Sequence, residues 1–202
     1  MIARTLFLPT IALACPAGAA GVVIDLRDAR GAPLTDVVVT VHATGRPTPR
    51  PEGLPWGAQV VQRNIQFQPA VMLVPVGATV GFPNQDAVRH HVYSFSKPKR
   101  FELKLYGREA ARTVTFDKPG TVTLGCNIHD RMRGFLRVVD TAWAGKSDAR
   151  GRVAIDGVTP GAATITVWHG AARAKGQEAS FAVVVPASGE LARAITVPLR
   201  DR

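Results

Sequence analysis

Cysteine is scarce in this chain of 202 residues, which contains only Cys15 and Cys126. Cys15 lies in an N-terminal segment that we expect to be removed on export, so the mature protein would keep a single thiol. A chain with one cysteine has no internal disulfide. In an oxidising compartment the thiol of Cys126 is therefore an inert buried group, an intermolecular link or a metal ligand that the metal protects.

Long hydrophobic runs are also absent. The apolar segment 5–14 is shorter than the roughly 20 residues that a membrane-spanning helix needs. It follows the basic Arg4 and precedes small residues at 17–19, which is the pattern of a cleaved export signal. We predict a signal peptide at 1–20, a periplasmic location and no transmembrane helix in the mature chain. A retained anchor and lipidation at Cys15 are the less favoured alternatives.

Familiar catalytic patterns are missing as well. The sequence shows no Ser-His-Asp arrangement, no phosphate-binding loop and no pair of catalytic carboxylates. We therefore expect a protein that is not an enzyme. Methionine occurs only three times, Met1 included, which disfavours a methionine-rich surface for copper delivery.

The chain is strongly basic. Lysine and arginine number 25 against 15 aspartate and glutamate residues, so the formal net charge is +10. Because an exported protein does not meet nucleic acid, we expect this charge to attract an acidic docking surface on a partner protein, or an anionic membrane surface. A basic face that is merely solvated is the alternative.

Short β-branched runs between glycine, proline and Asx turns make up most of the remaining sequence, and they predict an all-β fold. No segment of the mature chain shows a helical stripe of useful length, and only 100–111 is compatible with a short helical turn. The expected strands lie at 22–26, 37–41, 71–74, 79–82, 92–95, 112–116, 121–124, 135–139, 152–155, 164–168, 181–185 and 194–197.

Two segments far apart in the chain share a strand, turn and strand pattern. They are 21–41 and 146–168, and both contain Asp-Ala-Arg-Gly. Together they resemble the carboxypeptidase regulatory-like, transthyretin-like β-sandwich. We predict that 21–45 plus 143–202 form this sandwich, and that a second domain at 58–140 is inserted in it or appended to it. The proline-rich segment 46–57 would be the linker, and three successive modules are the alternative.

The segment with the clearest chemistry runs from Gly125 to Gly134 and reads Gly-Cys-Asn-Ile-His-Asp-Arg-Met-Arg-Gly. It places a thiol, an imidazole and a thioether on one turn between two expected strands, in the spacing C-x-x-H-x-x-M. Soft sulfur donors together with imidazole select copper. A further histidine comes from the segment 82–93, where His90 and His91 are both candidates. Adjacent strand residues point to opposite faces, so only one of them should reach the metal.

These two motifs resemble those of the cupredoxins, and of the amicyanins most closely, over about 71–139. The family includes copper proteins of methylamine utilization. The resemblance implies a Greek-key β-sandwich with one type 1-like copper ion that cycles between Cu(I) and Cu(II). It also selects His90 over His91, and it implies that His129 is the electron exit. The implied copper ligands are His90, Cys126, His129 and Met132.

The function implied by this resemblance is electron transfer in the periplasm, between redox proteins such as a dehydrogenase and a cytochrome. Two alternatives remain open. One is a periplasmic module that binds or delivers copper, and the other is a structural β-sandwich that binds a ligand without redox chemistry. Asp86 and Asp130, which resemble catalytic carboxylates, are better interpreted as residues that form turns and brace loops.

Overall fold

A computed structural model describes residues 20–50, 59–110 and 112–200 of the chain. Nearly all of the predicted signal peptide and most of the predicted linker lie outside these residues. The described chain is all-β, as the sequence predicts, and it contains sixteen strands and one short 3-10 helix, η1 (Lys175–Gln177). Within it, no helix has the length and apolar character needed to cross a membrane.

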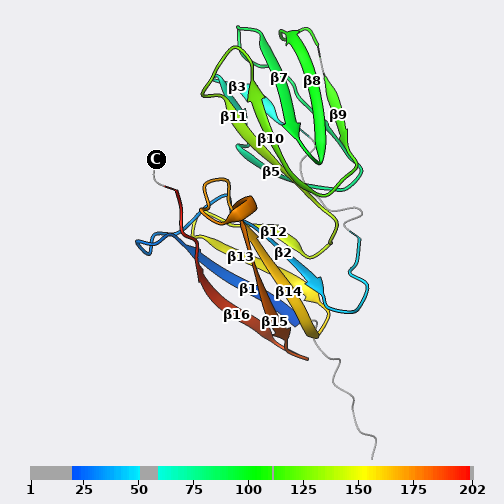
Figure 1. Ribbon diagram of the computed structural model, residues 1–202, viewed down its shortest axis with the longest axis vertical. Coiled ribbons are helices and arrows are strands. Elements are labelled where there is room, and N and C mark those ends of the chain that lie inside the picture. The colour runs from blue at the N-terminus through cyan, green and yellow to red at the C-terminus, as the bar shows by residue number, and fades with distance from the viewer. Residues whose placement is uncertain (1–19, 51–58, 111, 201–202) are drawn as a thin grey trace, which may run out of the picture.

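Residues 59–110 and 112–139 form one body, called here the site sandwich (Figure 1, cyan to yellow-green strands). Its main sheet has the order β5-β11-β10-β7-β8, and the smaller pairs β3-β4 and β6-β9 complete it. Apolar side chains of these strands form one core around Phe82, Phe116 and Leu136. The bounds are β3 (Val61–Arg63), β4 (Gln66–Gln68), β5 (Val71–Pro75), β6 (Ala78–Gly81), β7 (His90–Ser96), β8 (Lys99–Tyr106), β9 (Thr113–Phe116), β10 (Gly120–Cys126) and β11 (Arg133–Val139).

Residues 20–43 and 144–197 form a second body, called here the companion sandwich. Its two sheets have the orders β13-β1-β16 and β12-β2-β14-β15, with β1 and β16 parallel. The bounds are β1 (Ala20–Arg27), β2 (Val38–Ala43), β12 (Ala144–Lys146), β13 (Arg152–Val158), β14 (Gly161–Trp168), β15 (Glu178–Val185) and β16 (Glu190–Thr196). The chain thus leaves this body after β2, builds the site sandwich, and returns at β12.

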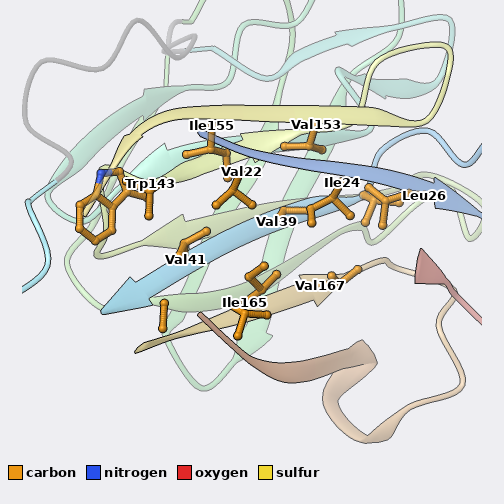
Figure 2. Close-up of a cluster of buried hydrophobic side chains, with 14 of the residues drawn as sticks. Val22, Ile24, Leu26, Val39, Val41, Trp143, Val153, Ile155, Ile165 and Val167 are labelled. Atoms are coloured by element: carbon orange, nitrogen blue, oxygen red, sulfur yellow. The ribbon is translucent and has the colours of Figure 1, made fainter. Parts of the chain in front are cut away.

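The core of the companion sandwich follows from the two-residue period of its strands. Val22, Ile24 and Leu26 alternate along β1 and are fully buried between the two sheets. Side chains from β2, β13 and β14 meet them from both sides, and Trp143 lies at one end of the cluster (Figure 2). The indole nitrogen of Trp143 donates to the Gly157 carbonyl, so its polar atom is satisfied.

The two sandwiches share an apolar contact. Trp168 of β14 is fully buried there, and its ring meets the Phe135 ring of β11 edge to face, with centroids 5.3 Å apart. The Arg137 guanidinium lies over the same indole and pairs with Glu178 of β15 at 3.2 Å. The other buried members of this cluster are Val38, Val71, Leu73 and Val139.

The segment 100–111, the one place where the sequence is compatible with a short helical turn, is mainly strand. β8 occupies Lys99–Tyr106, and a turn at 108–109 follows it without forming a helix. Its backbone pairs with β7, and Phe101 and Leu103 pack against the core while Glu102 faces out. The lysine, arginine and glutamate residues of this segment are good helix formers. Their alternation with apolar residues, however, places the apolar side chains on one face of the strand and the charged ones on the other.

Candidate metal centre

Two strand ends and the loop between β10 and β11 bring the candidate ligands together. β7 begins at His90 and β10 ends at Cys126, and the two strands are antiparallel neighbours with Cys126 opposite Val92. The loop 127–132 then carries His129 and Met132 before β11 starts. Its shape is held by two backbone bonds, from Asn127 to the His91 carbonyl and from Met132 to the His129 carbonyl.

Three donor atoms converge at this end of the site sandwich. The Cys126 sulfur lies 3.7 Å from Nδ1 of His90 and 3.5 Å from Nδ1 of His129. One donor atom from each residue lies within 4.8 Å of the other two, which is the spacing of groups that can share an ion. The two imidazole rings are tilted by 59° with centroids 5.0 Å apart, so they approach the thiol from different directions.

The two histidines differ in their exposure. His90 is fully buried, whereas His129 is partly exposed on the loop. Cys126 is 4% exposed and has no disulfide partner. A thiol and an imidazole therefore lie in the interior of the site sandwich, and a second imidazole links them to the protein surface.

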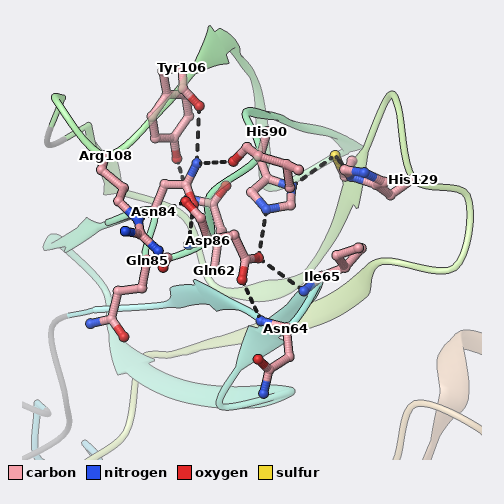
Figure 3. A network of polar contacts seen from close by, with 12 residues as sticks. Gln62, Asn64, Ile65, Asn84, Gln85, Asp86, His90, Tyr106, Arg108 and His129 are labelled. Atoms are coloured by element: carbon pink, nitrogen blue, oxygen red, sulfur yellow. Dashed lines mark hydrogen bonds and ion pairs between the residues drawn. The ribbon is translucent and has the colours of Figure 1, made fainter.

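His90 is oriented by a carboxylate. Its Nε2 lies 2.8 Å from Oδ2 of Asp86, and a hydrogen bond from Nε2 to this carboxylate leaves Nδ1, the atom nearer the Cys126 sulfur, as the one that can bind a metal (Figure 3). Asp86 is held in turn by the backbone amides of Asn64 and Ile65, at 2.6 and 3.0 Å. Such a second layer of hydrogen bonds fixes the orientation of a metal-binding imidazole.

The environment of Asp86 favours its ionised form. Burial raises the pKa of this carboxyl, but hydrogen bonds from Ile65, His90 and Asn64 outweigh burial, and the pKa lies below its ordinary value. Asp86 also fixes its own loop, since its amide donates to Oδ1 of Asn84. The interpretation of Asp86 as a turn-forming and bracing residue is consistent with these contacts.

His91 lies on the opposite face of β7. Its Nε2 is 2.7 Å from Oε1 of Glu102 on β8, and its side chain is 17% exposed. The structure thus places His90, and not His91, beside the Cys126 sulfur. Strand alternation explains the difference, because the side chains of adjacent residues leave a sheet on opposite faces.

Met132 lies at the end of the ligand loop, directly before β11. Its side chain is 2% exposed and belongs to the same apolar cluster as Cys126. The two residues also line one small cavity, together with Tyr93 and Arg133. The sequence motif predicts the Met132 thioether as the fourth donor, and this stays a prediction.

A buried polar network behind His90 was not predicted from the sequence. Gln62 of β3 is fully buried and donates from Nε2 to the Phe82 carbonyl at 3.0 Å and to the Tyr106 hydroxyl. The Tyr106 hydroxyl also donates to the Phe82 carbonyl, at 2.7 Å. Asn84 donates to the Tyr106 carbonyl and so joins this network to the loop of Asp86. Neither Gln62 nor Tyr106 lies in a motif or at a spacing that predicts this network from the sequence.

The remaining histidines do not extend the centre. His42 pairs with Asp140 at 3.0 Å on the companion sandwich, and Nδ1 of His169 accepts a hydrogen bond from the Ala171 amide. Among the described residues, His90, Cys126 and His129 are the one group of histidine, cysteine and acidic side chains spaced for a metal ion. A thiol with two imidazoles and a nearby thioether is a donor set that suits copper.

No family model and no curated protein matches the chain. A comparison with solved structures did give matches. A copper-containing nitrite reductase from Thermus scotoductus is 31% identical, with a TM-score of 0.40, over 49% of this chain and 25% of its own. A purple cupredoxin from Nitrosopumilus maritimus is 23% identical, with a TM-score of 0.38, over 41% of this chain and 100% of its own. A reduced amicyanin variant is 24% identical, with a TM-score of 0.38, over 50% of this chain and 99% of its own. The chain thus spans a quarter of the nitrite reductase and is similar to the two smaller proteins over nearly their whole length.

Proposed function

We propose that this chain is a periplasmic electron carrier of the cupredoxin type, in which His90, Cys126, His129 and Met132 hold one copper ion. The observation that carries the proposal is the convergence of one sulfur and two imidazole nitrogens within 4.8 Å of one another. Copper bound there would supply a one-electron couple between Cu(I) and Cu(II). No bond breaks and no proton moves in such an exchange.

The surrounding chain favours electron transfer over substrate chemistry. Four protein donors leave no open position for a substrate, and the sandwich holds them with the hydrogen bonds of three strands and one loop. Asp86 keeps His90 in one tautomer and one orientation. Apolar side chains around Cys126 and Met132 exclude water from the sulfur atoms. A ligand set fixed in this way changes little between two oxidation states.

We infer that electrons enter and leave at His129, because it is the candidate ligand with partial exposure. The partners would be redox proteins such as a dehydrogenase and a cytochrome, with acidic docking surfaces that complement the net charge of +10. The companion sandwich would be the carboxypeptidase regulatory-like domain. A role in methylamine utilization is the finer form of this proposal, and a methylamine dehydrogenase is the donor that would test it.

Direct electrochemistry of the copper-loaded protein tests the proposal. We expect a reversible one-electron wave and exchange with hexacyanoferrate, with the copper retained over repeated cycles. A Cu(I) chelator is the second reagent, because a delivery protein must release its ion. Loss of copper to the chelator within the time of a voltammetric cycle, together with an irreversible wave, would favour copper delivery instead. The burial of Met132 is unfavourable for such release.

A further inference from the structure

β15 is a long strand at the edge of its sheet. It pairs with β14 on one side, and no other described strand pairs with it on the other side. An open edge exposes backbone amides and carbonyls that can pair with the backbone of another chain. Proteins block such edges with charged side chains, with proline or with a β-bulge. The residues of β15 therefore decide whether its edge can accept a further strand.

The other long edge strands carry such blocking features, whereas β15 does not. Among the described strands of seven or more residues, those at a sheet edge are β8, β13, β15 and β16. β8 has four charged side chains, β16 has two, and β13 has two together with an irregular register against β1. β15 has one, Glu178 at its start, and its pairing with β14 runs through all eight residues without a shift. β15 is thus the long edge that is left open to pairing.

The exposed side chains of β15 are small and uncharged over most of its length. Ser180, Ala182 and Val184 are exposed, the last of them by 71%. Glu178 pairs with Arg137 at 3.2 Å, so its charge is matched within the chain. Two copies of a chain with a net charge of +10 repel each other, and an edge without basic residues lets them meet with no like charges in contact. This pattern favours a second copy of the chain as the occupant of the edge.

Symmetry restricts how β15 can pair with its copy. Opposite residues of an antiparallel pair share a face of the sheet, so a two-fold axis must place one residue opposite itself. With Ala182 at the axis, Phe181 lies opposite Val183, and the apolar inner rows of the two sandwiches become continuous. Glu178 then lies beyond the paired residues and keeps its contact with Arg137. The small side chain of Ala182 also lets the two backbones approach at the axis.

We propose that two copies of this chain associate by antiparallel pairing of their β15 edges, with Ala182 of one copy opposite the same residue of the other. The pairing would join the two four-stranded sheets into one continuous sheet. One pair of strands buries less than the roughly 1,200 Å² of a stable interface, so the dimer is weak. We expect a dissociation constant on the order of 10 to 100 µM.

Such a dimer leaves the metal centre accessible. β15 runs along the companion sandwich away from the site sandwich (Figure 1). In the site sandwich, β7 ends and β10 begins beside the companion sandwich, because Ser96 and Gly120 line one cleft with Thr166 of β14. The opposite ends of β7 and β10 carry His90 and Cys126. The dimer therefore goes beyond the proposed function and does not depend on it.

Sedimentation of the copper-loaded mature protein tests the dimer, at concentrations from about 1 to 500 µM. The unmodified protein should change from monomer to dimer over this range. Ala182→Lys should stay monomeric, because like charges directly opposite each other in a sheet are unfavourable. Ala192→Lys is the matched control, since it adds the same charge to an exposed alanine of the β16 edge, and it should dimerise as the unmodified protein does.

A mixing experiment tests the register. Ala182→Glu alone should be monomeric for the same reason as Ala182→Lys, whereas an equimolar mixture of the two variants should form the dimer, because opposite charges then meet at the axis. Circular dichroism should show the unmodified fold in both variants, since the substituted side chain is exposed. Electron exchange with hexacyanoferrate should be the same for Ala182→Lys and the unmodified protein, so a failure of the dimer is distinguishable from a failure of the proposed function.

Several results would overturn the inference. It fails if the unmodified protein is monomeric at every concentration, or if Ala182→Lys and Ala192→Lys weaken the dimer equally. It also fails if the mixture of the two Ala182 variants stays monomeric, because another surface or another register would then hold the dimer. Species that grow beyond a dimer with concentration would show open-ended association instead of two-fold pairing.

Discussion

At the scale of single residues, the arrangement of His90 depends on Asp86, four residues earlier in the chain. The carboxylate accepts hydrogen bonds from the buried imidazole and from two amides of the β3–β4 turn. Removing it would leave Nε2 of His90 buried without a partner, and a buried unsatisfied donor is costly. Asp86 is therefore the residue outside the ligand set with the largest expected effect on the centre.

For Asp86→Ala we expect the free energy of unfolding to fall by about 2 kcal/mol and the copper affinity by about 10-fold to 100-fold. Urea denaturation of the metal-free protein and competition with a copper chelator measure the two quantities. Asp86→Asn is the control, since an amide oxygen in the position of Oδ2 can still accept the hydrogen bonds from Ile65 and His90, and this variant should lose less of both quantities. Unchanged stability and affinity in Asp86→Ala would show that this carboxylate does not hold His90.

Tyr106 gives a prediction about alkaline pH. Burial outweighs the hydrogen bond from Gln62 and the charge of Arg112, and it raises the pKa of Tyr106 to about 12. A raised pKa means that the neutral phenol stabilises the fold fully below the ordinary value near 10, and that this contribution is lost as the pH rises through 12. We expect a loss of about 2 kcal/mol between these values. Urea midpoints measured from pH 9 to 12 should fall less steeply in Tyr106→Phe, and equal slopes would contradict the assignment.

Much of the candidate centre could be proposed from local sequence, because three ligand candidates lie within seven residues of one loop and His90 lies in a second recognisable motif. The structure places the thiol and both imidazoles within reach of one ion. The part that supports His90 could not be predicted in the same way. Asn64 and Ile65 act through backbone amides, which any residue carries, and Gln62 depends on a tertiary contact with Tyr106.

At the scale of elements, two Asp-Ala-Arg-Gly turns in the companion sandwich use the same local hydrogen bonds. Oδ1 of Asp28 accepts from the amides two and four residues later, and Asp148 does the same. The glycines that end them, Gly31 and Gly151, both have positive φ. Their surroundings differ, because Gly31 is open to solvent while Gly151 lies against the backbone of β1 and Leu34.

These turns provide a matched pair of substitutions. In Gly31→Ala the added methyl group meets nothing within 4 Å, so only the left-handed backbone costs energy, about 1 kcal/mol. In Gly151→Ala the methyl group would overlap the Leu26 carbonyl oxygen and lie 2.9 Å from the Leu34 amide nitrogen. We expect that variant to lose more than about 3 kcal/mol. Equal urea midpoints for the two variants would contradict the close packing of this turn against β1.

Most strands of four or more residues could be predicted, with β8 as the exception, while the three-residue strands could not. Runs such as 71–74 and 164–168 combine β-branched residues with clear turns, and both lie within strands, β5 and β14. β3, β4 and β12 have three residues each, too few to show a period of two. For β8, the pairing with β7 is what decides its conformation, and pairing is not visible in a single segment.

At the scale of the whole molecule, the two sandwiches are joined by a buried contact as well as by the chain. Phe135 lies on β11, the strand that follows the ligand loop, and it packs against Trp168 and Gly170 of the companion sandwich. Lys146 adds a hydrogen bond to the Val71 carbonyl at 3.0 Å. The companion sandwich therefore covers the part of the main sheet formed by β5 and β11.

Two phenylalanines of the same sheet test this coupling. Phe135→Ala should lower the free energy of unfolding by about 3 kcal/mol and separate the unfolding transitions of the two sandwiches. Phe95→Ala, at a position 76% exposed, should change it by less than about 0.5 kcal/mol. Denaturation followed by both tryptophan fluorescence and circular dichroism distinguishes one transition from two. A single, unshifted transition in Phe135→Ala would show that this contact contributes neither to the free energy of unfolding nor to the coupling of the two sandwiches.

The central claim, that Cys126 and His90 belong to one copper centre, is tested most directly by the visible absorption and electron paramagnetic resonance spectra of the Cu(II)-loaded protein. We predict an intense thiolate-to-copper band that is lost in Cys126→Ser and retained in His91→Ala. A colourless protein that takes up no stoichiometric copper, or a band that disappears with His91 rather than with Cys126, would contradict the account.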